Sequence, residues 1–201
     1  MDAQSQWTGL DAGRLERITE HFERNYIGPG KIAGCQISVA RHGHLAYFKS
    51  FGQMDRERAK PTRDDTIYRI YSMTKPITSV AFMMLVDEGR VALDEPVHKY
   101  IPAWKNLGVF MAGTYPAFLT RPPTRPMLIV DLLRHTSGLT YGFQQRSNVD
   151  AAYREMKIGE VVKSGTLQSM IADLARIPLE FSPGEGWNYS VSTDVIGLVI
   201  E

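Results

Sequence analysis

Residues 71–89 read YSMTKPITSVAFMMLVDEG, and this stretch decides how the chain is interpreted. The run from Val80 to Val86 is almost unbroken in its apolar character. A helix that is apolar on every side is normally buried in the middle of a domain, so we expect a buried helix here. Pro76 fits only in the first turn, where no backbone N–H bond is lost, which places the start of the helix at about Ser72.

Ser72 and Lys75 lie three residues apart at this helix start, so their side chains share one face at about 5–6 Å. A serine hydroxyl needs a base before it becomes a nucleophile. Lysine can act as that base if burial and the positive end of the helix lower its pKa. The same pattern also arises from a capping serine followed by a surface lysine, and about one S-x-x-K match is expected by chance in such a chain.

Tyr189 is a second candidate, because it lies between the glycine-rich segment FSPGEGWN (181–188) and an apolar run that predicts a helix over Ser192–Glu201. A phenol beside a lysine has a lowered pKa and could share or replace Lys75 as the proton shuttle. A buried tyrosine with a hydrogen-bonded hydroxyl is the alternative. His135 and Ser137, in LLRHTSGL (132–139), are expected to cap and shape a turn, not to catalyse.

The rest of the chain predicts an α+β protein with few strands. The patterns indicate a helix over Leu10–Tyr26 with Asp11 as its cap, a hairpin of Gly34–Arg41 and Leu45–Gly52, an irregular surface segment over Val97–Pro126, and helices over Ile129–Arg134, Val149–Met156 and Leu167–Ala175. A two-stranded sheet is marginal by itself. We therefore expect further strands, and a complementary C-terminal segment of the same protein as a partner of residues 1–201.

Composition excludes several classes of protein. The chain has 201 residues, of which 43% are apolar and 22% charged, and its net charge of +1 gives no electrostatic basis for binding nucleic acid or an anionic membrane. No run approaches the ~18 apolar residues of a membrane helix. The start, MDAQSQWTGLDAG, lacks the pattern of a signal peptide, so a cytoplasmic location is expected.

Disulfides, metals and cofactors are not expected either. Cys35 is the single cysteine, which excludes an internal disulfide. His42 and His44 flank a turn glycine without a third ligand, so we expect them to be solvated. The sequence contains no Walker loop, G-x-G-x-x-G turn, H-E-x-x-H helix or G-x-S-x-G elbow.

Three motifs in order resemble the serine β-lactamase-like family, which comprises class C β-lactamases, penicillin-binding proteins and family VIII esterases. They are YSMTKPITSVAFMMLVDEGRVALDEPVHKYIP (71–102), LLRHTSGL (132–139) and SPGEGWNYSVSTDVIGLVIE (182–201). The resemblance implies a helical region beside an antiparallel sheet. It makes residues 1–201 the N-terminal portion of one catalytic domain, with residues 10–71 as the first helix and strands and 72–201 as the mainly helical region.

The resemblance also implies roles for single residues. Ser72 matches the acylated serine, Lys75 its partner in proton transfer, and Tyr189 the tyrosine that activates the serine. Tyr71, Trp187 and Val191, which neighbour these motif residues, are expected to contact the substrate. Val191 stands where β-lactamases usually carry an asparagine, and this departure favours the esterases and acyltransferases of the group. The family's third motif, Lys/His/Trp-x-Gly, which also gives one oxyanion-hole N–H, has no match in this chain.

The function expected from these residues is hydrolysis of small carboxylic esters through an acyl-enzyme on Ser72. A β-lactamase or D-peptidase, an acyltransferase, and a non-catalytic binding fragment are the alternatives. Trp104, Phe110, Tyr115 and Phe118 could wall an apolar acyl pocket, and they fit a bland core or surface cover equally well.

Overall fold

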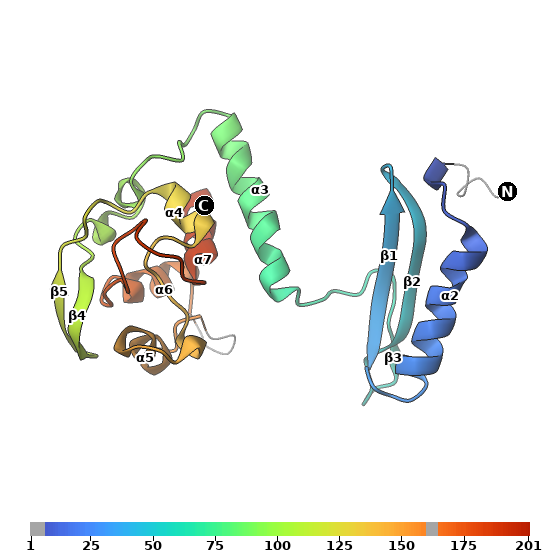
Figure 1. Cartoon of the computed structure of the whole chain (residues 1–201). Coiled ribbons are helices and arrows are strands. Elements are labelled where there is room, and N and C mark those ends of the chain that lie inside the picture. Colours follow the sequence, from blue (N-terminus) through green and yellow to red (C-terminus); the bar gives the residue numbers. More distant parts are fainter. Residues whose placement is uncertain (1–6, 160–164) are drawn as a thin grey trace. The chain divides into compact units, whose positions relative to one another are not determined.

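The computed structural model describes residues 7–159 and 165–201 (Figure 1). It combines helices with antiparallel strands, as the sequence predicts. The chain divides into two compact units, and the boundary between them lies between Arg69 and Ile70 in the sequence.

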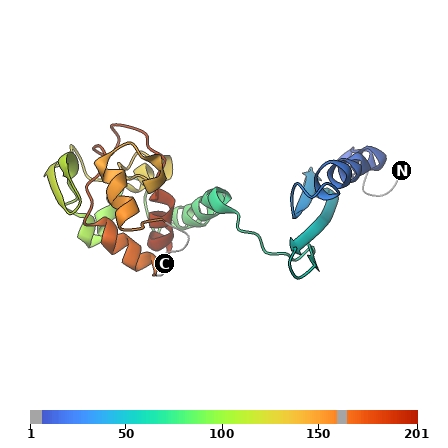
Figure 2. The ribbon, with the colours of Figure 1, turned by 90° about the horizontal axis from the view of Figure 1, so that it is seen from below.

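The first unit consists of one helix on a small sheet (Figures 1 and 2). Helix α2 (Ala12–Phe22) begins at Asp11, whose carboxylate accepts the Arg14 N–H at 2.8 Å, so the predicted cap is confirmed. A π-helical turn, Glu23–Ile27, continues it. Strands β1 (Gly34–Arg41), β2 (His44–Asp55) and β3 (Lys60–Pro61) pair antiparallel in that order.

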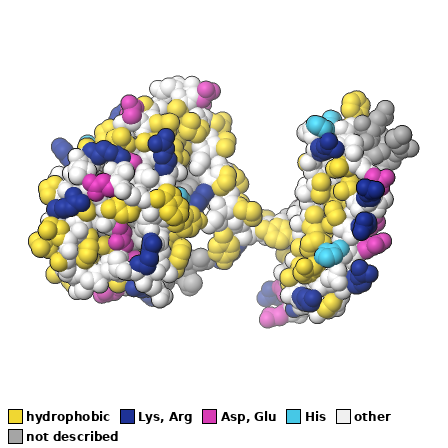
Figure 3. Space-filling view, in the orientation of Figure 1, with side chains coloured by type: hydrophobic (Ala, Val, Ile, Leu, Met, Phe, Trp, Pro, Cys, Tyr) yellow, Lys and Arg dark blue, Asp and Glu magenta, His cyan; other side chains and the backbone are white. Residues whose placement is uncertain are grey.

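The predicted hairpin and its turn are confirmed, although β2 is longer than expected. Arg41 pairs with His44 across a two-residue turn, in which His42 and Gly43 both have positive φ angles, 53° and 76°. Two positive φ angles suit the right-handed twist of the strands. Charged side chains gather along α2, while hydrophobic side chains cover the strands (Figure 3). The Phe51 side chain, 2% exposed, stacks near Phe22 with ring centres 6.0 Å apart.

The second unit holds the predicted helices with boundaries that differ by one residue at most from the sequence expectation after residue 128. They are α4 (Ile129–Arg134), α5 (Asn148–Glu155), α6 (Leu167–Leu174) and α7 (Ser192–Ile200). Ser147 and Thr166 cap α5 and α6 by accepting backbone N–H groups from the residues three positions later. The core lies among these helices, where Ile129, Leu132 and Val195 are fully buried.

The prediction of an irregular segment over Val97–Pro126 is wrong in part. It contains a hairpin of β4 (Val109–Thr114) and β5 (Ala117–Arg121), which turns at Tyr115-Pro116. The rings of Phe110 and Phe118 meet edge to face across it, with centres 6.0 Å apart. Proline and glycine obscured this hairpin because they lie in its turn and at its ends.

Helix α3 (Thr74–Asp87) departs most clearly from expectation, because the prediction that it is buried on every side is wrong for the described chain. Only Phe82 is buried, while Ile77 and Val80 are 62% and 63% exposed. Hydrophobic side chains are therefore visible along this helix in Figure 3. The other half of the prediction is confirmed, since a 3-10 turn, Tyr71–Met73, leads into α3 and places Pro76 in its first turn.

Candidate active site

Ser72 lies in the 3-10 turn at the start of α3, on an exposed stretch of backbone. The residue before it, Tyr71, has a φ angle of +46°, a left-handed conformation that is unusual for a bulky side chain. Such local strain costs about 1–3 kcal/mol and clusters at functional sites. The turn presents the Ser72 hydroxyl at the amino end of the helix, where backbone N–H groups favour a negative charge.

Tyr189 lies in the loop that leads into α7, 117 residues away in sequence, yet its hydroxyl is 2.6 Å from Ser72 Oγ. Lys75, one turn along α3, places Nζ 4.6 Å from the centre of the Tyr189 ring. The same Nζ donates a hydrogen bond to the hydroxyl of Tyr141 at 3.3 Å. The structure thus brings together Ser72, Lys75 and Tyr189, which the sequence singled out, and adds Tyr141.

The charges around Lys75 favour Tyr189 over Lys75 as the base. Burial lowers the pKa of Lys75, but interactions with the phenols of Tyr189 and Tyr141 outweigh burial and raise it above its ordinary value. The condition under which Lys75 itself could act as the base, a lowered pKa that leaves its amine neutral, is therefore not met. The pKa of Tyr189 is lowered, first by Lys75 and then by its hydrogen bond with Ser72. A protonated lysine stabilises a phenolate, and a phenolate can accept the serine proton.

A wide cavity of about 570 Å³ opens at these residues. Its lining includes the Tyr141 ring, stacked on Phe143 with centres 5.0 Å apart, and Asp194 from the first turn of α7. Burial raises the pKa of Asp194, although the positive charge of Lys75 opposes this. Sequence reasoning missed Tyr141 and Asp194. Their signals were available, since Tyr141 follows the HTSGL turn and Asp194 is the one acidic residue just after Tyr189.

The three residues predicted to contact substrate lie in different surroundings. Tyr71 lines the cavity. Val191 is fully buried at the N-cap of α7, so its side chain packs in the core and not in the cavity. The Trp187 side chain is 67% exposed and is also absent from the residues that line the cavity. Substrate contact therefore stays a prediction for Tyr71 and Trp187 only.

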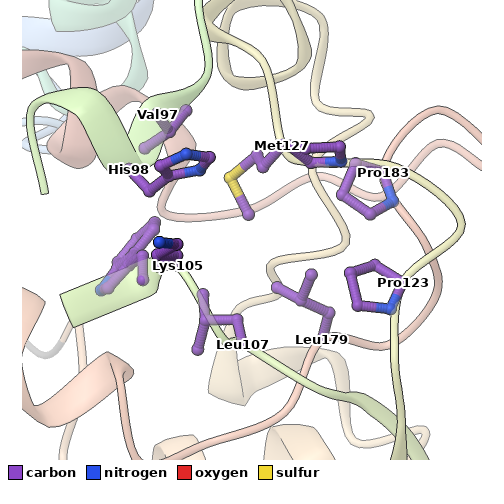
Figure 4. A pocket seen from close by; sticks show the side chains of 10 residues that line it. Val97, His98, Lys105, Leu107, Pro123, Met127, Leu179 and Pro183 are labelled. Atoms are coloured by element: carbon purple, nitrogen blue, oxygen red, sulfur yellow. The ribbon is translucent and has the colours of Figure 1, made fainter. Parts of the chain in front are cut away.

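The aromatic residues of the proline-rich segment do not line the cavity at Ser72. Trp104 is buried, and its indole N–H donates to the Ile171 carbonyl at 3.1 Å. It borders a separate small cavity of about 20 Å³, whose other lining residues include Val97, His98, Lys105, Leu107, Pro123, Met127, Leu179 and Pro183 (Figure 4). The segment therefore fits the interpretation as core and surface cover, and not the interpretation as the wall of an acyl pocket at Ser72.

Two features are absent from residues 7–159 and 165–201, a metal site and a membrane-spanning helix. No group of three or more His, Cys, Asp and Glu side chains in these residues has the arrangement of a metal site. None of the described helices combines the length and the apolar character that crossing a membrane requires. The first six residues, which belong to the segment used to predict location, lie outside the described part.

Comparison with known proteins matches the chain to one family and to several related proteins. The sequence model of the family described as "Beta-lactamase" matches residues 19–201. "Esterase EstB" from Burkholderia gladioli is 35% identical over 194 residues, which are 96% of this chain and 46% of EstB. "Acyltransferase calJ" from Penicillium decumbens is 33% identical over 144 residues, 71% of this chain and 33% of that protein.

A solved structure agrees with these sequence relatives. "EstCE1, a hydrolase with promiscuous acyltransferase activity" superposes with a TM-score of 0.78 at 28% identity, over 94% of this chain and 46% of that one. The likeness shows the β-lactamase-like fold of helices with antiparallel sheet. The chain spans about half the length, or less, of the relatives it matches.

Proposed function

Because the chain belongs to the beta-lactamase family, we propose that it supplies the nucleophile and base of a serine hydrolase that cleaves small carboxylic esters. The observation that carries the proposal is the 2.6 Å contact between Ser72 Oγ and the Tyr189 hydroxyl, with Lys75 Nζ 4.6 Å from the centre of the same phenol ring. The 35% identity to EstB supports the choice of an ester as substrate.

The reaction proceeds in two halves. Tyr189, as phenolate, takes the proton from Ser72 while Ser72 Oγ forms a bond to the ester carbonyl carbon. The tetrahedral intermediate then collapses, the bond to the alcohol oxygen breaks, and Tyr189 returns the proton to the leaving alcohol. A water molecule then attacks the Ser72 ester while Tyr189 takes its proton. As the bond between the carbonyl carbon and Ser72 Oγ breaks, Tyr189 returns this proton to Oγ, which releases the carboxylic acid and restores the Ser72 hydroxyl and the Tyr189 phenolate. Lys75 stays protonated throughout and keeps the pKa of Tyr189 low.

The negative oxygen of the tetrahedral intermediate needs hydrogen-bond donors. The Ser72 backbone N–H, at the amino end of α3, is the donor that we assign within this chain. The second donor is assigned to a segment outside residues 1–201, which we propose as the partner of this chain in the catalytic domain. Loss of one such donor typically costs ~10²–10³ in rate.

Acyl transfer to an alcohol is the second candidate. It uses the same acyl-enzyme and replaces the attacking water by an alcohol. The similarity to calJ, an acyltransferase, and to EstCE1, a hydrolase with promiscuous acyltransferase activity, favours it. Product analysis with an added alcohol separates the two, because transfer gives a new ester and hydrolysis gives only the acid.

The test is covalent labelling together with ester turnover, on the protein at its full encoded length. We expect a fluorophosphonate to add once, at Ser72, and a p-nitrophenyl ester of a short acid to be hydrolysed. Ser72→Ala should abolish both, while Ser79→Ala, further along the same helix, serves as the matched control and should keep both. Labelling at another serine, or turnover by Ser72→Ala, contradicts the assignment. Turnover of a cephalosporin without ester turnover favours a β-lactamase, and a folded protein without label favours a non-catalytic binding role.

A further inference from the structure

His135 contacts three consecutive residues of the loop that carries Tyr189. Its carbonyl oxygen accepts the N–H of Asn188 at 2.9 Å. Its Nδ1 lies 3.2 Å from Ser190 Oγ, and its ring centre is 4.9 Å from that of Tyr189. The residues on both sides of Tyr189 are therefore hydrogen-bonded to His135, and the phenol packs against the imidazole.

A chain of buried hydroxyl groups continues from His135. Ser190 Oγ is 2.7 Å from Ser192 Oγ, which is 2.8 Å from Ser137 Oγ, and all three serines are fully buried. At the far end the N–H of Leu139 donates to Ser137 Oγ at 3.2 Å. Of the two described contacts of Ser137 Oγ, the Leu139 N–H is a donor, so Ser192 Oγ is the one that can accept the Ser137 proton. We therefore assign the direction in which Ser137 donates to Ser192, Ser192 to Ser190, and Ser190 to His135.

That direction requires a free lone pair on Nδ1, and therefore a neutral imidazole. Burial and, second, the positive charge of Lys75 lower the pKa of His135, so the ring is neutral at pH 7. The charged group that acts on it is Lys75, and the titratable phenol packed on it is that of Tyr189, whereas the neighbouring Trp187 and Ser190 carry no charge. Protonation turns Nδ1 into a donor and reverses the chain, so that Ser137 Oγ accepts from both Ser192 and the Leu139 N–H, and the buried Ser137 proton loses Ser192 as its acceptor.

We propose that His135 is a positioning residue, which as a neutral hydrogen-bond acceptor for Ser190 holds Tyr189 against Ser72. The proposal rests on the proposed function, in which Tyr189 is the base. His135 touches no reacting atom and acts through the backbone and ring of Tyr189. Its protonation at acid pH releases this hold, so activity falls on the acid side of neutrality together with the charge state of His135.

The backbone of His135 decides which variant tests this. His135 ends α4 in the left-handed conformation, with a φ angle of 59°. Asparagine tolerates this conformation and offers a side-chain oxygen near the position of Nδ1, but it does not titrate. Alanine accepts no hydrogen bond and is strained at this φ angle. His135→Asn and His135→Ala therefore form a matched pair, one that keeps the acceptor and one that removes it.

The experiment measures kcat and KM against pH for ester hydrolysis by the full encoded protein. We expect His135→Ala to lose about 10²-fold in kcat with little change in KM, since small misplacements of a catalytic group have effects of this size. His135→Asn should retain most of the wild-type kcat, and the acid limb of its pH profile should move to lower pH. Ser190→Ala, which removes the donor to His135, should lower kcat in the same way as His135→Ala.

The outcomes separate this proposal from the proposed function. If His135→Asn keeps the wild-type acid limb, or if His135→Ala keeps the wild-type kcat, the positioning role is overturned. If the His135 variants do not fold, Ser190→Ala decides, and an unchanged kcat in it overturns the role equally. If instead Ser72→Ala and Tyr189→Phe still hydrolyse the ester, the proposed function itself has failed.

Discussion

Helices α3 and α7 contribute to the same site, and more than half of the residues in each are apolar, yet the two helices differ in how deeply they are buried. In α7, Val195 and Ile196 are fully buried, and the loop before it is anchored by buried serines. In α3, Phe82 is the one buried residue, and Ile77 and Val80 are mostly exposed. The side of the site that carries Ser72 is open, whereas the side that carries Tyr189 is held by the core.

The difference follows from the neighbours of each helix. α7 packs between α4, α6 and α3, so the core surrounds it. α3 also packs on α7, yet among its side chains only Phe82 is buried, and Leu85 and Val86 are partly buried against the core. Apolar composition therefore shows that a helix can be buried, and the surrounding elements determine which of its faces are.

The largest expected effect is a loss of activity on replacing one of the two phenols beside Lys75. We propose that the phenol of Tyr189 is the base and that the phenol of Tyr141 only supports Lys75. Tyr189→Phe removes the proposed acceptor of the serine proton and should lower kcat/KM about 10³-fold. Tyr141→Phe removes one hydrogen bond to Lys75 Nζ and should cost no more than about tenfold. Ester hydrolysis by both variants measures this. Equal losses would show that Tyr189 has no special role.

The next largest effect is on the free energy of unfolding, and it tests whether α7 is enclosed by the core while α3 is not. Ile196→Ala should lower the free energy of unfolding by about 3 kcal/mol, since it opens a cavity at a fully buried position. Urea unfolding midpoints measure the change. Val199→Ala, at a partly buried position on the same helix, is the control and should cost less. Equal costs at both positions would mean that the core does not enclose α7 as described.

Much of the site could be predicted from sequence, for reasons visible in single residues. Pro76 fixed the helix start, so Ser72 and Lys75 fell on one face without any knowledge of the fold. The partnership with Tyr189 came from the resemblance, because no local rule joins residues 117 positions apart. The direction of the Lys75 pKa could not be predicted, since it depends on Tyr141 and Tyr189 meeting one ammonium group.

The fold was predictable where local signals dominate and failed where tertiary packing decides. The caps at Asp11, Ser147 and Thr166 act within three residues, and the helices after them lie close to where the patterns placed them. In the β4–β5 hairpin Phe110 pairs with Thr120 and Gly113 with Phe118, and the two phenylalanine rings meet edge to face, none of which the proline-rich sequence revealed. The prediction that α3 is buried on every side was wrong because composition does not specify which neighbours a helix has.

The smallest expected effect sharpens that last point. Val80 is 63% exposed, so Val80→Ser should change the free energy of unfolding of residues 1–201 by about 0.5 kcal/mol or less. The matched variant is Val195→Ser, which places a hydroxyl at a fully buried position of α7 and should cost several times more. Measured on the full encoded protein, the same pair becomes diagnostic. A Val80→Ser cost that approaches that of Val195→Ser there, but not in residues 1–201, would mean that further sequence covers the open side of α3. The contrast between the two helices would then belong to residues 1–201 and not to the full encoded protein.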